Sequence, residues 1–64
     1  MTKIQTQERL IDVKETLDEV RVKLKYCQWI ELTEDITQID NDKVYDSQRK
    51  ILLNIDHIIE IYEQ

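Results

Sequence analysis

The sequence predicts an all-α protein, a helical hairpin made of a long helix and a shorter antiparallel helix. Three observations favour this fold class. The 64 residues include neither Gly nor Pro, and helix interiors exclude both residue types. Hydrophobic residues recur at spacings of three and four along most of the chain, which is the period of one helix face. Only residues 40–42 have the composition of a turn.

The first helix is expected at about residues 3–39. Its main signal is a heptad stripe, a set of hydrophobic residues separated alternately by three and four positions. The members of this heptad stripe are Leu10, Val13, Leu17, Val20, Leu24 and Cys27. The next two positions of the stripe are Glu31 and Glu34, so the hydrophobic face changes after Cys27.

Two interpretations of the following segment remain open. The helix can continue to about residue 39 and bury a different face, which begins at Trp29. Alternatively, it can break near residues 31–33, with Thr33 capping a short second helix. Because no Gly, Pro or Asn marks a break there, the continuous helix is favoured.

The turn at residues 40–42 has the sequence Asp-Asn-Asp. Side chains of this kind bond to the nearby backbone and begin helices. The last helix is expected at about residues 43–62, with the wide hydrophobic face of a bundle helix. The whole chain, residues 1–64, is therefore expected to be one helical domain.

Length arguments predict a homodimer. A helix of about 20 residues spans only about 30 Å, so the last helix cannot cover the start of the long one. Leu10, Val13 and Leu17 would then have no cover within the chain. The simplest way to bury them is a twofold dimer, a four-helix bundle or coiled-coil-like assembly with the heptad stripe as its core.

No motif for catalysis or for binding a metal or cofactor is visible. The chain has one Cys and one His, and no Gly-rich phosphate loop. We therefore expect a protein that is not an enzyme and that uses no cofactor. The acidic pI of about 4.7 opposes nucleic-acid binding, and no hydrophobic run is long enough for a membrane span. A lone cysteine fits the cytoplasm, which would be the host cytoplasm for a phage protein.

Two surfaces are candidates for binding a partner. The first is a second hydrophobic stripe on the expected long helix, opposite the heptad stripe. Its candidate contact residues are Ile11, Val22, Trp29 and Ile36. The second is an acidic cluster within residues 31–46, which hold six acidic residues and one Lys. Its members are Glu31, Glu34, Asp35, Asp40, Asp42 and Asp46. Of these, Glu31, Glu34, Asp35 and Asp42 are expected to be solvated.

The expected function is a non-enzymatic protein–protein interaction module. It would be a small helical regulator or inhibitor that binds a partner protein, of the kind that phages and mobile elements encode. The alternative is an acidic mimic of nucleic acid that blocks the basic groove of a DNA- or RNA-binding protein. A structural assembly subunit is the third candidate.

Overall fold

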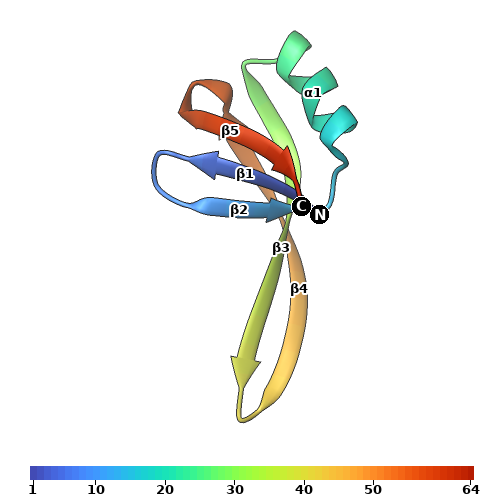
Figure 1. Ribbon diagram of the computed structural model, residues 1–64, viewed down its shortest axis with the longest axis vertical. Helices are drawn as coiled ribbons and strands as arrows, with labels where there is room; N and C mark the ends of the chain where they lie inside the picture. The colour runs from blue at the N-terminus through green and yellow to red at the C-terminus, as the bar shows by residue number, and fades with distance from the viewer.

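The computed structural model describes all 64 residues as a five-stranded antiparallel sheet with one short α-helix (Figure 1). In chain order the elements are β1 (Thr2–Thr6), β2 (Leu10–Val13), α1 (Leu17–Tyr26), β3 (Trp29–Asp40), β4 (Lys43–Asn54), the 3-10 helix η1 (Ile55–His57) and β5 (Ile58–Glu63). The strand order in the sheet is β4-β3-β2-β1-β5. Because β5 pairs with β1, the two chain ends meet, and the amino group of Met1 donates to the carbonyl oxygen of Gln64 at 2.9 Å.

The prediction of an all-α helical hairpin is wrong. The expected helices at about 3–39 and 43–62 do not exist, and neither does a helix capped by Thr33. The expected coiled-coil and four-helix-bundle arrangements are wrong as well, because they require these helices. Instead, β3 and β4 pair in register over their whole length, from Trp29 opposite Asn54 to Asp40 opposite Lys43.

The physical reason is visible in the residue types of β3. This strand holds one Trp, three Ile and two Thr, which are β-branched or aromatic side chains that pack well on a pleated surface. Its hydrophobic residues also alternate with period two. Ile30 and Leu32 are buried, whereas Trp29 and Glu31 are exposed. This period of two is typical of a strand. It determines the structure here, although the same hydrophobic residues also fall three and four positions apart, as in a helix.

Helix α1 is the one segment where the heptad stripe does describe a helix. Thr16 caps it, because its hydroxyl oxygen accepts a hydrogen bond from the amide of Glu19 at 3.2 Å. Thr and Glu three residues apart are a known signal for a helix start. Val20 is fully buried, and Leu24 packs beside it against the core.

The core is small. It consists of six buried side chains, Ile4, Ile11, Val13, Val20, Ile30 and Leu32. Strands β1, β2 and β3 supply five of them and α1 supplies the sixth. Helix α1 therefore covers the same face of the sheet on which these strands place their buried side chains. A chain of this length buries a limited share of its surface, so a few polar contacts weigh heavily in its stability.

The chain turns at Asn41 and Asp42, inside the segment 40–42 where the sequence predicts a turn. Both residues have positive φ, 50° and 63°, as a two-residue type I′ hairpin turn requires. The turn therefore joins two strands and not two helices. Asn and Asp are among the few residues other than Gly that adopt this backbone readily.

The end of the β3–β4 hairpin projects from the molecule as an arm, defined here as residues 35–48 (Figure 1). The arm accounts for the elongated shape, 42 × 21 × 21 Å. Strand β2 pairs with β3 at a single position, Val13 opposite Glu34, so β3 has a free edge beyond Glu34. Strand β4 stands at the end of the sheet and has a free edge throughout.

The turn gives the first prediction. Replacing Asp42 by Gly removes the Cβ that disfavours positive φ, so Asp42→Gly should raise the free energy of unfolding by about 0.5–1 kcal/mol. Asp42→Ala is the matched control and should lower it, because Ala keeps the Cβ. Urea unfolding followed by circular dichroism measures both variants. A Gly variant no more stable than the Ala variant would contradict the turn geometry.

Candidate functional site

The arm begins directly after Glu34, whose side-chain carboxylate is buried. Glu34 is only 5% exposed, although buried charges are rare unless they are paired. Arg9, from the β1–β2 turn, donates two hydrogen bonds to its carboxylate, at 2.5 and 3.2 Å. Arg49, directly opposite on β4, donates a third from Nε at 2.8 Å. One carboxylate therefore joins the β1–β2 turn, β3 and β4.

This pairing keeps Glu34 ionised. The hydrogen bonds from Arg9, followed by those from Arg49, hold the pKa of Glu34 below its ordinary value, although burial acts in the opposite direction. The hydrogen bond to Glu34 in turn raises the pKa of Arg9. The contact is therefore a charged one at neutral pH.

A second set of bonds holds β3 one residue before Glu34. The amide of Lys14 donates to the carbonyl oxygen of Thr33, and the amide of Thr33 donates to Oε1 of Glu15, both at 2.8 Å. Burial raises the pKa of Glu15, but the hydrogen bonds from Thr33 and from the backbone of Glu15 itself, together with the positive charge of Lys50, outweigh it, and the net pKa is lowered. The segment after β2 thus satisfies the backbone of β3 where strand pairing ends.

The arm carries three exposed hydrophobic side chains near its tip. Ile39, Val44 and Tyr45 are 76%, 63% and 50% exposed. Ile39 and Val44 are directly opposite each other and share one face of the hairpin. Tyr45 is opposite Gln38, on the other face. Hydrophobic side chains therefore lie on both faces of the tip.

The arm is also acidic. Its 14 residues include four Asp and one Lys, for a net charge of −3. Asp46 accepts a hydrogen bond from the hydroxyl of Thr37 at 3.2 Å, and Asp35 accepts one from the side-chain amide Nε2 of Gln48 at 2.9 Å. These cross-strand bonds order the arm and leave its carboxylates at the surface.

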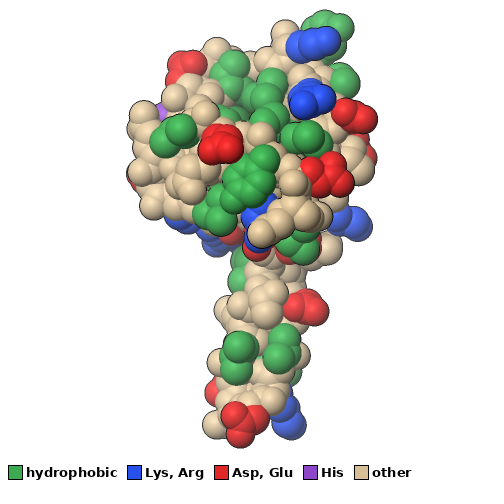
Figure 2. All heavy atoms as spheres, viewed as in Figure 1, with side chains coloured by type: hydrophobic (Ala, Val, Ile, Leu, Met, Phe, Trp, Pro, Cys, Tyr) green, Lys and Arg blue, Asp and Glu red, His purple; other side chains and the backbone are tan.

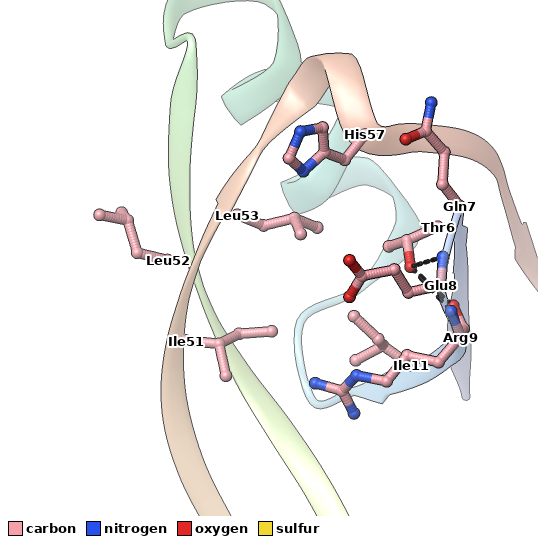
Figure 3. A pocket seen from close by; sticks show the side chains of 9 residues that line it. All are labelled: Thr6, Gln7, Glu8, Arg9, Ile11, Ile51, Leu52, Leu53 and His57. Carbon is pink, nitrogen blue, oxygen red and sulfur yellow. Dashed lines mark hydrogen bonds between the residues drawn. The ribbon is translucent and has the colours of Figure 1, made fainter.

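A groove with a volume of about 430 Å³ lies between the β1–β2 turn, β4 and η1 (Figure 3). Ile51 and Leu53 point from β4 toward the β1–β2 turn, whereas Leu52 points away (Figure 3). Glu8 and His57 also line it. Four of its nine lining residues are hydrophobic, and no hydrogen bond joins His57 to a carboxylate.

The outer face of α1 is a further surface with exposed hydrophobic groups. Val22 and Tyr26, one helical turn apart, are 55% and 80% exposed. Arg21 and Lys25 lie beside them, also one turn apart. Figure 2 shows basic side chains next to hydrophobic ones on this end of the molecule. Trp29 follows at the start of β3 and is 54% exposed.

The structure distributes the heptad stripe over two elements. Val13 and Val20 are in the core, and Leu17 and Leu24 are partly buried on the inner side of α1. Leu10, on β2, and Cys27, after α1, are exposed. These residues do not form one continuous face, and the uncovered long helix that led us to expect a twofold dimer is not present.

The second hydrophobic stripe is divided as well. Ile11 belongs to the core, and Ile36 is half-buried at the base of the arm. Val22 and Trp29 are exposed and remain candidates for contact with a partner.

The acidic cluster is mostly where the sequence predicts it, but its members have different roles. The expectation that Glu34 is solvated is wrong, because two arginines enclose it. Glu31 is exposed, with an oxygen 4.0 Å from the Nζ of Lys50. The remaining four members, Asp35, Asp40, Asp42 and Asp46, lie on the arm.

Sequence reasoning missed the hydrophobic tip and both arginines of the Glu34 cluster. The tip could have been found, because a two-residue Asn-Asp turn between segments rich in β-branched residues indicates a hairpin. The arginines could not have been found, because they are 25 and 15 residues from Glu34 in sequence.

Comparison with protein-family models, with curated proteins and with solved structures gives no match to this chain. No helix is both long enough and hydrophobic enough to cross a membrane. No group of three or more His, Cys, Asp or Glu side chains is placed to hold a metal ion. Three surfaces described above remain candidates for binding a partner, namely the arm, the groove and the outer face of α1.

The Glu34 cluster gives the second prediction. Glu34→Gln keeps the side-chain size but removes the charge that both arginines bind, so the free energy of unfolding should fall by about 1–3 kcal/mol. Because the pKa of Glu34 is lowered in the folded protein, its contribution is complete above the ordinary value of about 4.3 and is lost as the pH falls through the lower, folded value. Wild type should therefore lose stability on acidification more steeply than Glu34→Gln.

Urea unfolding at neutral pH and at pH values below the ordinary glutamate pKa measures both effects. Glu31→Gln is the matched control, since it removes an exposed carboxylate from the same strand, and it should change little. If Glu34→Gln and Glu31→Gln lowered the free energy of unfolding equally, Glu34 would not stabilise the base of the arm.

Proposed function

We propose that this chain is a non-enzymatic protein–protein interaction module that binds its partner through the β3–β4 arm. The observation that carries the proposal is the exposure of Ile39, Val44 and Tyr45 at the end of an arm that nothing else in the chain covers. An isolated two-stranded hairpin is marginally stable in water. A partner that covers the tip would bury these side chains and stabilise the arm.

Several features favour a protein as the partner. The arm has free edges on both strands, and unpaired strand edges bind extended segments of other proteins by adding a strand. Tyr is enriched in protein interfaces, and Tyr45 lies at the tip. The net charge of −3 on the arm opposes contact with nucleic acid or an anionic membrane.

A regulator or inhibitor fits this arrangement, because a projecting arm can occupy a surface that its partner needs for another interaction. The proposed function involves no cofactor. Cys27 is an exposed free thiol, and an unpaired cysteine is typical of reducing compartments. We therefore place the interaction in the cytoplasm, or in the host cytoplasm if a phage encodes the chain.

The acidic arm supports a second candidate function, mimicry of nucleic acid. Asp35, Asp40, Asp42 and Asp46 project from the body on a narrow hairpin, which could enter the basic groove of a DNA- or RNA-binding protein. The two candidates differ in their response to salt. Binding by charge weakens steeply with added salt, whereas binding by the hydrophobic tip changes little.

Affinity capture from a lysate of the source organism tests the proposed function. The double variant Ile39→Ser, Val44→Ser removes the hydrophobic pair from the tip. Ile59→Ser is the control, because Ile59 is 66% exposed on β5, outside the arm. A specific partner should be retained by wild type and by Ile59→Ser, at low and high salt, and its yield should fall at least tenfold with the tip variant.

Equal retention by the tip variant would contradict the proposal that the arm is the binding element. Retention that depends on salt and not on the tip variant would favour the acidic mimic.

A further inference from the structure

The two ends of the molecule carry opposite charge. The arm has a net charge of −3. Residues 21–27, the end of α1 and the residue after it, hold three basic residues and no acidic one, whereas Asp18 and Glu19 lie in the first turn of α1, with Oδ1 of Asp18 3.8 Å from Arg21. The tip of the arm and α1 lie at opposite ends of the long axis (Figure 1), whose extent is 42 Å. An acidic end and a basic end therefore face away from each other in one chain.

Both ends also expose hydrophobic side chains, and their arrangements are complementary. At the acidic end, the Ile39–Val44 pair shares its face of the hairpin with Asp46, whereas Asp40 lies at the same tip on the other face, opposite Lys43. At the basic end, Val22 and Tyr26 form one exposed row on α1. Positions 21 and 25 of a helix lie about 100° from positions 22 and 26, so Arg21 and Lys25 form a parallel basic row.

We propose that the arm tip of one copy docks on the outer face of α1 in a second copy, so that copies of this chain associate head to tail. In this contact the Ile39–Val44 pair covers Val22 and Tyr26, and the aspartates of the tip approach Arg21 and Lys25. The inference rests on the proposed function of the arm as the binding element and names a second copy as its partner.

Charge decides between this contact and the other ways in which two copies could meet. Pairing of arm with arm would place two charges of −3 together, and pairing of α1 with α1 would bring two groups of three basic residues together. Like charges that meet at an interface are unfavourable. The two surfaces cannot meet within one chain, because they lie at opposite ends. Of these three contacts, only the one between different ends joins opposite charges.

A single contact between two different surfaces leaves the pair of copies with one free arm and one free α1 face. Association therefore either closes, as a reciprocal pair or a larger ring, or continues as an open filament. Because part of the attraction is between exposed charges, added salt should weaken it.

Reversal of charge at each end tests the proposal. The first variant, Arg21→Glu with Lys25→Glu, makes the α1 face acidic like the arm. The second variant, Asp40→Lys with Asp46→Lys, makes the arm basic like the α1 face. The control, Glu60→Lys with Glu63→Lys, makes the same charge change as the second variant, and one of the same size as the first but opposite in sign, on exposed positions of β5. Sedimentation equilibrium at low salt measures association, and circular dichroism verifies that each variant is folded.

Wild type and the β5 control should sediment above the monomer mass of 7.8 kDa. Each reversed variant alone should associate at least tenfold more weakly, because its two ends then carry the same charge. An equimolar mixture of the two reversed variants should regain association, since the basic arm of one meets the acidic α1 face of the other.

A wild type that stays monomeric at low salt, or a mixture that fails to associate, would overturn the proposal. Wild-type association that neither reversal weakens would also overturn it and would indicate a different interface. The proposed function has a separate readout: if a foreign protein is still captured through the hydrophobic tip while self-association fails, the arm remains a binding element and only the second copy is excluded.

Discussion

The buried carboxylate of Glu34 is the contact on which the arrangement of this protein depends. It lies at the one position where β2 pairs with β3, so it marks the boundary between the five-stranded body and the two-stranded arm. A buried charge without partners would cost several kcal/mol, and here Arg9 and Arg49 bind it from two other segments. A polar contact as well as hydrophobic burial therefore stabilises the packing of the sheet around its small core.

The pairing of buried Glu34 with two arginines explains how so small a protein keeps an exposed arm ordered. With only six buried hydrophobic side chains in its core, the body gains little free energy that could offset the ordering of a hairpin that contacts nothing else. The arm is instead an extension of two strands that are already fixed at Thr33 and Glu34, and its turn suits the backbone of Asn41 and Asp42. The hydrophobic residues at its tip are exposed and pack against no other part of the chain than the hairpin itself.

Part of this structure could be predicted from the sequence. The turn at residues 40–42, the concentration of acidic residues near it, and the inward face of α1 at Val20 and Leu24 follow from local patterns. The fold class could not be read from spacing alone, because hydrophobic residues in a strand that alternates imperfectly also fall three and four positions apart. The role of Glu34 could not be predicted either, because a solvated and a buried glutamate look alike until distant arginines are placed beside it.

Amide hydrogen exchange, measured residue by residue by NMR at a concentration where the chain is monomeric, tests most directly whether the arm is held at its base and uncovered beyond it. The amides of Lys14 and Thr33, which donate across the base of the arm, should exchange among the slowest in the protein. Exchange should become faster from Glu34 toward Asn41, because local opening of an exposed hairpin needs little free energy. Fast exchange at Lys14 and Thr33, or protection as strong at the tip as at the base, would contradict this account.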